Sequence, residues 1–318
     1  MSEQNGQQTD TPRGPYSHLQ EILESGRFAV AAELGPPKSA DRSVIEHKAQ
    51  LLGDWADAIN VTDNQTAVTR MSSMAACAIL VSMGLDAVFQ ITCRDRNRLA
   101  IQNDILGASA LGIRNVLCLT GDDVSMGNHP DAKRVHDLGS IEMVQAVQRM
   151  RDHGKFISND DLKGEGPQMF IGAASNPFAP PYDFRPVRLA KKIRAGAQFI
   201  QTQCVFDIER FKAFMVDVRQ MGLHEQVHIL PGVMPVKKAA IMKFMAQNVP
   251  GMSIPQELVE RMEAAADPEE EGIRICVETI QALREIEGVH GVHIMALMWE
   301  KIVPEIVQRA KLREEPVT

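Results

Sequence analysis

The sequence predicts an α/β protein whose single domain is a (β/α)8 (TIM) barrel. Eight short apolar runs, rich in β-branched residues and each ending in a turn or a polar residue, begin at Phe28, Ala58, Ala87, Asn115, Met169, Phe199, His228 and Val292. The first four begin 30, 29 and 28 residues apart, which is the length of a strand followed by a crossover helix. The runs lack regular polar alternation, as is typical of a parallel sheet covered on its faces. Eight such units are the number that closes a barrel.

The segments between these runs have the apolar spacing of amphipathic helices, for example SVIEHKAQLLGDW and RFKAFMVDVRQMG. A leading helix is expected at His18–Ser25. Two longer gaps indicate insertions after strands 4 and 7: a loop, a helix and the polar stretch SNDDLKGEGPQ in the first, and three helices, from the end of strand 7 through Glu287, in the second. A doubly wound open sheet is the alternative fold. It normally carries a GxGxxG turn after its first strand, and this sequence has none.

Composition excludes several classes of protein. Of the 318 residues, 44% are hydrophobic and 24% charged, which is typical of a globular chain. A net charge of -7 disfavours a nucleic-acid binder, and no apolar run has the roughly 18 residues that a membrane span needs. Five scattered cysteines form no CxxC pair, which argues against disulfides and a zinc ribbon. With a polar tail at residues 1–15 before a barrel at 16–318, we expect a cytoplasmic protein.

The polar residues at the strand ends predict where the active site lies, because chemistry in such barrels occurs at the carboxyl ends of the strands. The ends of strands 7 and 8, Met234 and Met298, are apolar. A pocket that combines acids, amides and hydroxyls with an apolar wall suits a flat polar heterocycle. The polar strand-end residues are Glu33, Thr62, Asp63, Thr92, Asp122, Asp123, Ser175 and Gln203.

Glu33 stands inside an apolar strand, between Ala32 and Leu34 and before a rigid Gly-Pro-Pro exit. Carboxylates are seldom buried without a partner, so its position requires an explanation. Either the strand end has already reached solvent, or Glu33 is a general acid whose pKa is raised by burial. The sequence leaves both alternatives open.

Asp122 and a group of cations form two further candidate sites. Asp122 follows Gly121, so it either accepts hydrogen bonds from a ligand or belongs to an ordinary turn. Arg188, Lys191 and Lys192 have helical spacing and are expected on one face early in a helix, as phosphate ligands or as a solvated patch. No metal-ligand spacing is present, and the scattered histidines His224, His228, His290 and His293 are expected to be structural.

At these residues the chain resembles the methylenetetrahydrofolate reductase family, flavin-dependent barrels of one-carbon metabolism. The matching segments, in the family's order, are AELGPP, NVTDNQTA, QITCRDRN, NVLCLTGDD, GAASNPF, RLAKKIRAGAQFIQTQCVFD and LPGVMPV. The resemblance implies reduction of 5,10-methylenetetrahydrofolate to 5-methyltetrahydrofolate, a reaction that serves methionine biosynthesis. It also implies a bound FAD or FMN, and NADH or NADPH as the electron donor.

The resemblance also assigns site residues, position by position. Glu33 matches the catalytic acid, Asp122 the aspartate between flavin and pterin, and Gln203 the amide that binds the pterin. Positions that match flavin contacts are Thr62, Gln90, Thr120, Gly121, Leu138, Gly139, Ala174, Ser175, Arg188, Lys191 and Lys192.

The sequence departs from the better-known members of the family at several positions. Gln90 and Thr120 replace a histidine and an arginine, and Met295 replaces a tyrosine. Ile241, Met245 and Trp299 replace residues that hold folate or nicotinamide in those members. These changes favour an alternative function, a flavin- and folate-binding subunit of a larger electron-transfer complex that is inactive with NAD(P)H alone. Such a subunit would form a homo-oligomer or bind a small partner. An unrelated barrel lyase, which would be colourless, is a third alternative.

Overall fold

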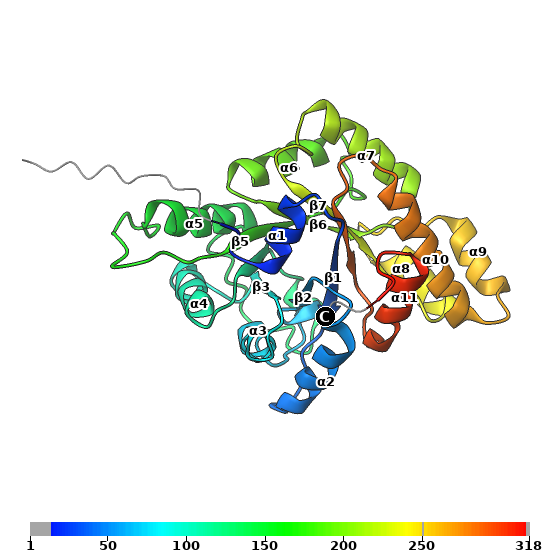
Figure 1. Cartoon of the computed structure of the whole chain (residues 1–318), viewed down its shortest axis with the longest axis horizontal. Helices are drawn as coiled ribbons and strands as arrows, with labels where there is room; N and C mark the ends of the chain where they lie inside the picture. The colour runs from blue at the N-terminus through cyan, green and yellow to red at the C-terminus, as the bar shows by residue number, and fades with distance from the viewer. Residues whose placement is uncertain (1–13, 250, 316–318) are drawn as a thin grey trace, which may run out of the picture.

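The structure, a computed structural model, describes residues 14–249 and 251–315. Its eight strands form a closed parallel barrel in the order of the sequence (Figure 1). The strands are β1 (Ala29–Leu34), β2 (Ala58–Val61), β3 (Ala87–Thr92), β4 (Asn115–Leu119), β5 (Phe170–Ser175), β6 (Phe199–Cys204), β7 (His228–Val233) and β8 (Gly291–Ile294). The first seven strands lie within the predicted runs, and β8 begins one residue before the eighth run, so the predicted barrel is confirmed.

Helices surround the barrel, and most begin at a side chain that caps them (Figure 1). Asp267, for example, accepts the backbone N–H groups of Glu269 and Glu270, and Pro268 occupies the first turn of its helix. The α-helices are α1 (His18–Glu24), α2 (Arg42–Leu52), α3 (Ser73–Ser82), α4 (Arg98–Ala110), α5 (Ser140–His153), α6 (Phe184–Arg194), α7 (Ile208–Gln220), α8 (Ala239–Asn248), α9 (Gln256–Ala264), α10 (Pro268–Arg284) and α11 (Val303–Arg309). Short 3-10 turns are η1 (Gln65–Ala67), η2 (Val124–Met126) and η3 (Glu300–Ile302).

Both predicted insertions are present. The segment between β4 and β5 contains η2, α5 and a polar stretch that one isolated bridge, from Lys155 to Asp161, folds back on itself. The segment between β7 and β8 contains α8, α9 and α10. Of the predicted N-terminal tail, residues 1–13 lie outside the described residues.

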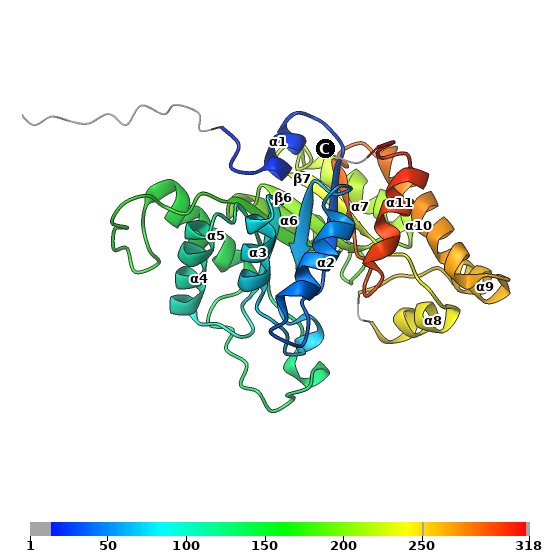
Figure 2. The same ribbon diagram turned by 60° about the horizontal axis from the view of Figure 1, so that its bottom comes forward.

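The leading helix α1 covers the end of the barrel at which the strands begin. Figure 2 shows α1 at one end of the molecule and α8, which follows β7, toward the other. Leu19, Ile22 and Leu23 of α1 pack onto inward-facing strand residues, including Phe170 and Phe199, whose rings stack with centroids 5.0 Å apart. This apolar cluster closes the amino-terminal end of the barrel.

Buried polar groups hold α1 in place. The Asp86 carboxylate accepts the backbone N–H of Leu19 at 2.8 Å and an amide hydrogen of Asn115 at 2.8 Å. The Ser17 hydroxyl donates to Asn115. Burial raises the pKa of Asp86 to about 6, although these hydrogen bonds oppose the rise. The sequence therefore fastens α1 to β3 and β4 by specific bonds as well as by apolar contact.

A second polar layer lies deeper in the barrel, between the apolar cluster and the carboxyl ends. The side-chain amides of Asn60 on β2 and Gln201 on β6 exchange two hydrogen bonds, of 2.6 and 3.0 Å, across the barrel. Both residues are buried, so each amide satisfies a group that would otherwise lose its hydration.

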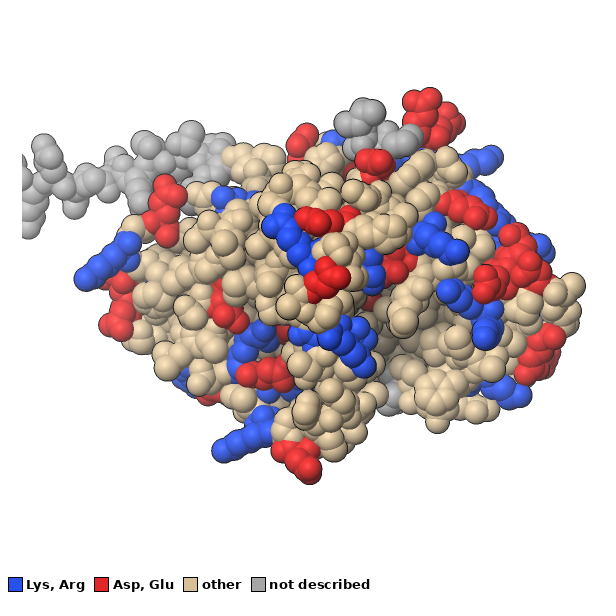
Figure 3. Space-filling model, turned by 90° about the horizontal axis from the view of Figure 1, so that it is seen from below, with Lys and Arg blue, Asp and Glu red and all other residues tan. Residues whose placement is uncertain are grey.

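Charges of both signs are mixed on the surface. In the view from below, Lys and Arg side chains alternate with Asp and Glu (Figure 3). Among residues 14–249 and 251–315, no helix has both the length and the apolar character needed to cross a bilayer.

Candidate active site

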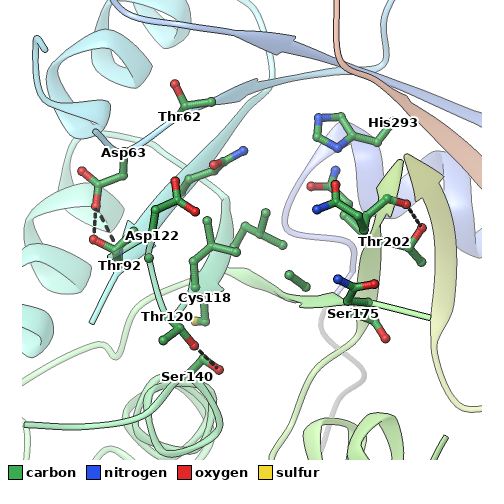
Figure 4. A pocket seen from close by; sticks show the side chains of 18 of the residues that line it. Thr62, Asp63, Thr92, Cys118, Thr120, Asp122, Ser140, Ser175, Thr202 and His293 are labelled. Carbon is green, nitrogen blue, oxygen red and sulfur yellow. Dashed lines mark hydrogen bonds between the residues drawn. The ribbon is translucent and has the colours of Figure 1, made fainter. Parts of the chain in front are cut away.

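A cavity of about 510 Å³ lies at the carboxyl ends of the strands. The structure brings most of the predicted site residues to its walls: Glu33, Thr62, Gln90, Thr120, Gly121, Asp122, Ala174, Ser175, Arg188, Lys192 and Gln203. Thr62 and Asp122 lie on one side of it, and Ser175 and His293 lie on the other (Figure 4). Within the described residues, no group of three His, Cys, Asp or Glu side chains is arranged to hold a metal ion.

The prediction that the three cations share one face early in a helix is wrong. Helix α6 begins at Phe184, so Lys191 and Lys192 lie in its last turn. Lys191 is exposed and its Nζ lies 5.4 Å from the centre of the Phe184 ring, outside the cavity. Of these three predicted cations, Arg188 and Lys192 line the cavity and Lys191 does not.

Two other predicted residues, Leu138 and Gly139, also do not line the cavity. Leu138 is buried, and Gly139 is the N-cap residue of α5. The next residue, Ser140, does line the cavity, and its hydroxyl accepts a hydrogen bond from Thr120 at 3.3 Å.

Glu33 is buried at the end of β1, with 6% of its surface exposed. The alternative that this strand end reaches solvent is therefore wrong. Burial raises the pKa of Glu33 to about 7, the amides of Gln90 and Gln65 partly oppose the rise, and the nearby acids Glu300 and Asp122 add to it. Acid and carboxylate forms are thus both well populated near neutral pH, as a general acid requires.

His293 of β8 faces Glu33, contrary to the expectation that this histidine is structural and that the end of strand 8 is apolar. Its Nε2 lies 3.8 Å from Glu33 Oε2, too far for a hydrogen bond, and has no hydrogen-bond partner among the described residues. Burial lowers the pKa of His293 to about 3, so the ring is neutral. The strand ends at Ile294, and Met298 lies beyond it with 85% of its surface exposed.

The turn at Gly121 and Asp122 is built around a buried arginine. Gly121 has a φ of +91°, and a Cβ there would lie 2.9 Å from the Cβ of Arg94, so only glycine fits without strain. Arg94 donates to the backbone carbonyl of Asp122 at 3.2 Å and binds the Asp95 carboxylate with two nitrogens. The Asp122 carboxylate itself is exposed at the cavity wall, and its Oδ2 accepts the Thr66 N–H at 2.8 Å.

Cations from α6 line another part of the cavity wall. Lys192 is buried and donates to the carbonyl oxygen of Ala174. Burial, together with the charge of Arg188, lowers the pKa of Lys192 to about 8. Arg185 also lines this wall. Three cations from one helix, Arg185, Arg188 and Lys192, favour an anion such as a phosphate at this wall.

Unpartnered polar atoms indicate that the cavity is built for a polar ligand. Within the part of the chain that the structure describes, the buried Thr62 hydroxyl has no hydrogen-bond partner, and neither has His293 Nε2. The Gln203 side chain, at a register shift between β6 and β7, is only half-buried and accepts its neighbour's N–H at 3.0 Å. A flavin fits this set of residues, because Thr62 offers a free hydroxyl, Gly121 permits close approach and Lys192 and Arg188 can hold phosphate.

Comparison with known proteins decides the family. The sequence profile described as methylenetetrahydrofolate reductase matches residues 18–311. The chain belongs to the methylenetetrahydrofolate reductase family. The resemblance at the strand-end motifs is thereby confirmed over nearly the whole chain.

Individual relatives are distant. The chain is 26% identical over 253 residues to a probable methylenetetrahydrofolate reductase (NADPH) of Caenorhabditis elegans, a match that covers 77% of this chain and 35% of that protein. It is 24% identical to methylenetetrahydrofolate reductase (NADH) 1 of Zea mays, covering 93% of this chain and 51% of that protein. It is 25% identical to 5,10-methylenetetrahydrofolate reductase of Pectobacterium carotovorum, covering 86% of both. The chain thus spans about a third to a half of the longer relatives.

One solved structure has the same fold along its length. It is described as an uncharacterized protein from Clostridium thermocellum that binds two copies of 5-methyl-5,6,7,8-tetrahydrofolic acid. The match has a TM-score of 0.62 and 14% sequence identity and covers 93% of this chain and 97% of that one.

Inspection of strand ends alone missed several cavity residues. Gln201 and His293 lie inside their strands, where counting in steps of two from the inward-facing Phe199 and Gly291 would have found them. Gln65 and Arg94 follow strands 2 and 3 in loops whose course the sequence pattern does not predict. Asp63 and Thr92, which the strand-end positions do predict, also line the cavity, as does Met295. The remaining lining residues are Leu117, Cys118, Leu119, Ser140, Asn176, Arg185, Leu189 and Thr202.

Among the family departures, only Gln90, Thr120 and Met295 line the cavity. Trp299 and Met245 are buried elsewhere, with 5% and 8% of their surface exposed. Ile241, on α8, is 45% exposed.

Proposed function

We propose that this chain binds a flavin, FAD or FMN, and reduces 5,10-methylenetetrahydrofolate to 5-methyltetrahydrofolate with Glu33 as the proton donor. The observation that carries the proposal is Glu33 itself, a buried carboxyl group whose pKa is raised to about 7 in the same cavity as Asp122 and Gln203. Family membership supports the choice of substrate. The folate ligand named for the Clostridium thermocellum structure agrees with it.

The chemistry explains why a buried acid is needed. The one-carbon unit of the substrate is a saturated carbon bridging N5 and N10, which accepts a hydride poorly. A proton delivered from Glu33 to N10 breaks the bond between N10 and this carbon and leaves an N5 iminium, a strong hydride acceptor. When bound, a reduced flavin supplies the hydride, which it obtains from NADH or NADPH.

The other cavity residues would position the ligands. Asp122 and Gln203 carry hydrogen-bonding groups that match the N–H and carbonyl edge of a pterin, and so fix its register. Thr62 and the backbone at Gly121 would contact the flavin ring, and Arg188 and Lys192 its phosphates. His293, held neutral beside Glu33, adds no charge that would force the acid to ionise.

The test uses the purified full chain. We expect a yellow protein, and we expect Glu33→Gln to keep the flavin while folate turnover falls by about 10²- to 10⁴-fold, the usual worth of general acid catalysis. Asp123→Asn is the matched control, because Asp123 is exposed and pairs with Arg134 rather than facing the cavity. Near-normal turnover in Glu33→Gln would contradict the assignment of the acid.

Binding of the flavin phosphates has its own matched pair of variants. Lys192→Met should weaken flavin affinity at least about tenfold, because a buried cation is lost, whereas Lys191→Met should leave affinity unchanged. Flavin fluorescence quenching measures both. Equal effects of the two variants would show that the phosphates do not bind at this wall.

An alternative is that the chain is one subunit of an electron-transfer complex and is inactive with NAD(P)H alone. It is favoured by apolar side chains exposed on α8, where Ile241 is 45% and Phe244 60% exposed. Anaerobic mixing of the yellow protein with NADH and NADPH distinguishes the two. Rapid loss of colour supports direct reduction, and no change with either donor supports the partner-dependent form.

A further inference from the structure

The loop between β2 and α3 carries unusual backbone strain. Three of its residues that are not glycine, Asn64, Thr66 and Ala67, have φ values of +47°, +54° and +55°. Asparagine tolerates this left-handed conformation, but a β-branched threonine is a rare occupant of it. Such strain persists only where surrounding contacts impose it, and it is often found at functional sites.

Specific contacts hold the strained loop from both sides. Asp122 Oδ2 accepts the Thr66 N–H at 2.8 Å, and Arg94 Nη2 donates to the Asn64 carbonyl oxygen at 3.4 Å. Gly127 of the β4–α5 connection packs so closely that a Cβ there would lie 1.8 Å from the Ala67 oxygen. A second cavity, of about 660 Å³, lies beside the loop and is lined by Asn64 and Ala67. The segment 64–67 therefore contributes to the lining of both cavities, and the contacts around it set its conformation.

Within the strained segment 64–67, Gln65 is the residue that lines the active-site cavity. Its Nε2 donates to Glu33 Oε1 at 3.3 Å. In a protonated carboxyl group the carbonyl oxygen is the stronger acceptor, so the Gln65 bond favours the acid hydrogen on Oε2. Gln90, the other amide that hydrogen-bonds to Glu33, is unchanged in the variants described below. Oε2 is the oxygen that faces the unpartnered Nε2 of His293 at 3.8 Å.

We propose that Gln65 is a positioning residue that fixes which oxygen of Glu33 carries the proton, and that the strained loop at residues 64–67, held by Asp122, sets this contact. The inference rests on the proposed function, in which Glu33 is the acid. In the reaction the O–H bond at Oε2 breaks, the proton passes to substrate N10, and its electron pair remains on the carboxylate. The Gln65 hydrogen bond then stabilises that carboxylate.

The arrangement also links ligand binding to the acid. Asp122 is exposed to the cavity and at the same time holds the Thr66 N–H, one residue from Gln65. A pterin that hydrogen-bonds to Asp122 therefore acts on the loop that positions Glu33.

The experiment measures Glu33 directly in the full-length protein. Infrared difference spectroscopy detects the C=O band of its protonated form, which is assigned by its loss in Glu33→Gln. In Gln65→Leu the band should move to higher frequency, because the carbonyl oxygen loses its donor, and Glu33 should titrate at a higher pH. Folate turnover should fall roughly tenfold in kcat, with KM changed less than twofold. The titratable groups around Glu33, namely Asp122, Glu300, His293 and Cys204, are unchanged in this variant.

Two further variants complete the test. Gln102→Leu removes a buried amide of α4 that donates to the Arg98 carbonyl oxygen outside the cavity, and should leave the band and kcat unchanged. Thr66→Gly relaxes the strained residue and should shift the band in the same direction as Gln65→Leu without lowering Tm. An unmoved band and titration in Gln65→Leu would overturn the proposal. A shifted band in a protein that reduces no folate would support the positioning contact and count against the proposed reaction instead.

Discussion

Replacing Glu33 by glutamine should make the protein more stable, and the gain should depend on pH. The pKa of Glu33 is raised from 4.5 to about 7 in the folded protein. Below pH 4.5 the carboxyl group is protonated in both the folded and the unfolded state. Above that pH the unfolded state ionises first, so the wild type loses stability until the folded state also ionises near pH 7. Glutamine has no proton to lose and escapes this penalty.

The size of the effect follows from the two pKa values. They differ by 7 − 4.5 = 2.5, and each pKa unit is worth roughly 1.4 kcal/mol, so the stability difference between variant and wild type should grow by about 3 kcal/mol between pH 4.5 and pH 8. This is a large fraction of the stability of a typical domain. The prediction requires neither a flavin nor a folate, and so tests the burial of the acid separately from its role.

Urea unfolding followed by circular dichroism at pH 4.5, 5.5, 6.5 and 8 measures this difference. Glu209→Gln is the control, because it changes the net charge equally at an exposed side chain of α7. Its stability difference from wild type should stay nearly constant across the same range. A Glu33→Gln difference that is equally constant would refute the conclusion that Glu33 titrates with a raised pKa.

Three further outcomes are expected. The kcat for folate reduction should fall about tenfold per pH unit above pH 7, because the protonated fraction of Glu33 falls by that factor, and a pH–rate profile measures it. Asn60→Leu should cost about 1–3 kcal/mol in urea unfolding by leaving the Gln201 amide buried and unpaired, and Asn60→Leu combined with Gln201→Leu should recover most of this. Gly121→Ala should destabilise by about 2 kcal/mol or more, because φ is +91° and a Cβ would clash, whereas Gly26→Ala, with φ +76° and open space, should cost only about 1 kcal/mol.

The barrel could be predicted from the sequence because its repeat is local. Each strand and its crossover helix recur within 28–30 residues at the start of the chain, and turn residues mark their ends. Glu33 could also be found locally, since a carboxylate between Ala32 and Leu34 contradicts its apolar surroundings. These features need no knowledge of how distant segments meet.

The rest of the site depends on contacts between distant segments. Lys191 has the same helical spacing from Arg188 as an inward-facing residue would have, but only the orientation of α6 on the barrel decides that Lys192 is buried and Lys191 exposed. Gln65 acquires its role because Asp122, 57 positions away (122 − 65 = 57), holds the backbone beside it. The sequence predicts a structural role for His293 because the apolar run around it extends past the true end of β8, which hides its place near the carboxyl end of the strand.

The short helix α1 determines from which side ligands can reach the active-site cavity. The leucines of α1 and the stacked Phe170 and Phe199 rings fill the amino-terminal end of the barrel. The active-site cavity is therefore closed at that end and opens only at the carboxyl ends of the strands. A ligand that binds beside Glu33 has to enter and leave through this same opening. Two reactants that bind at the same place beside Glu33 cannot be there together. Under the proposed function, a nicotinamide and a folate would therefore bind one after the other.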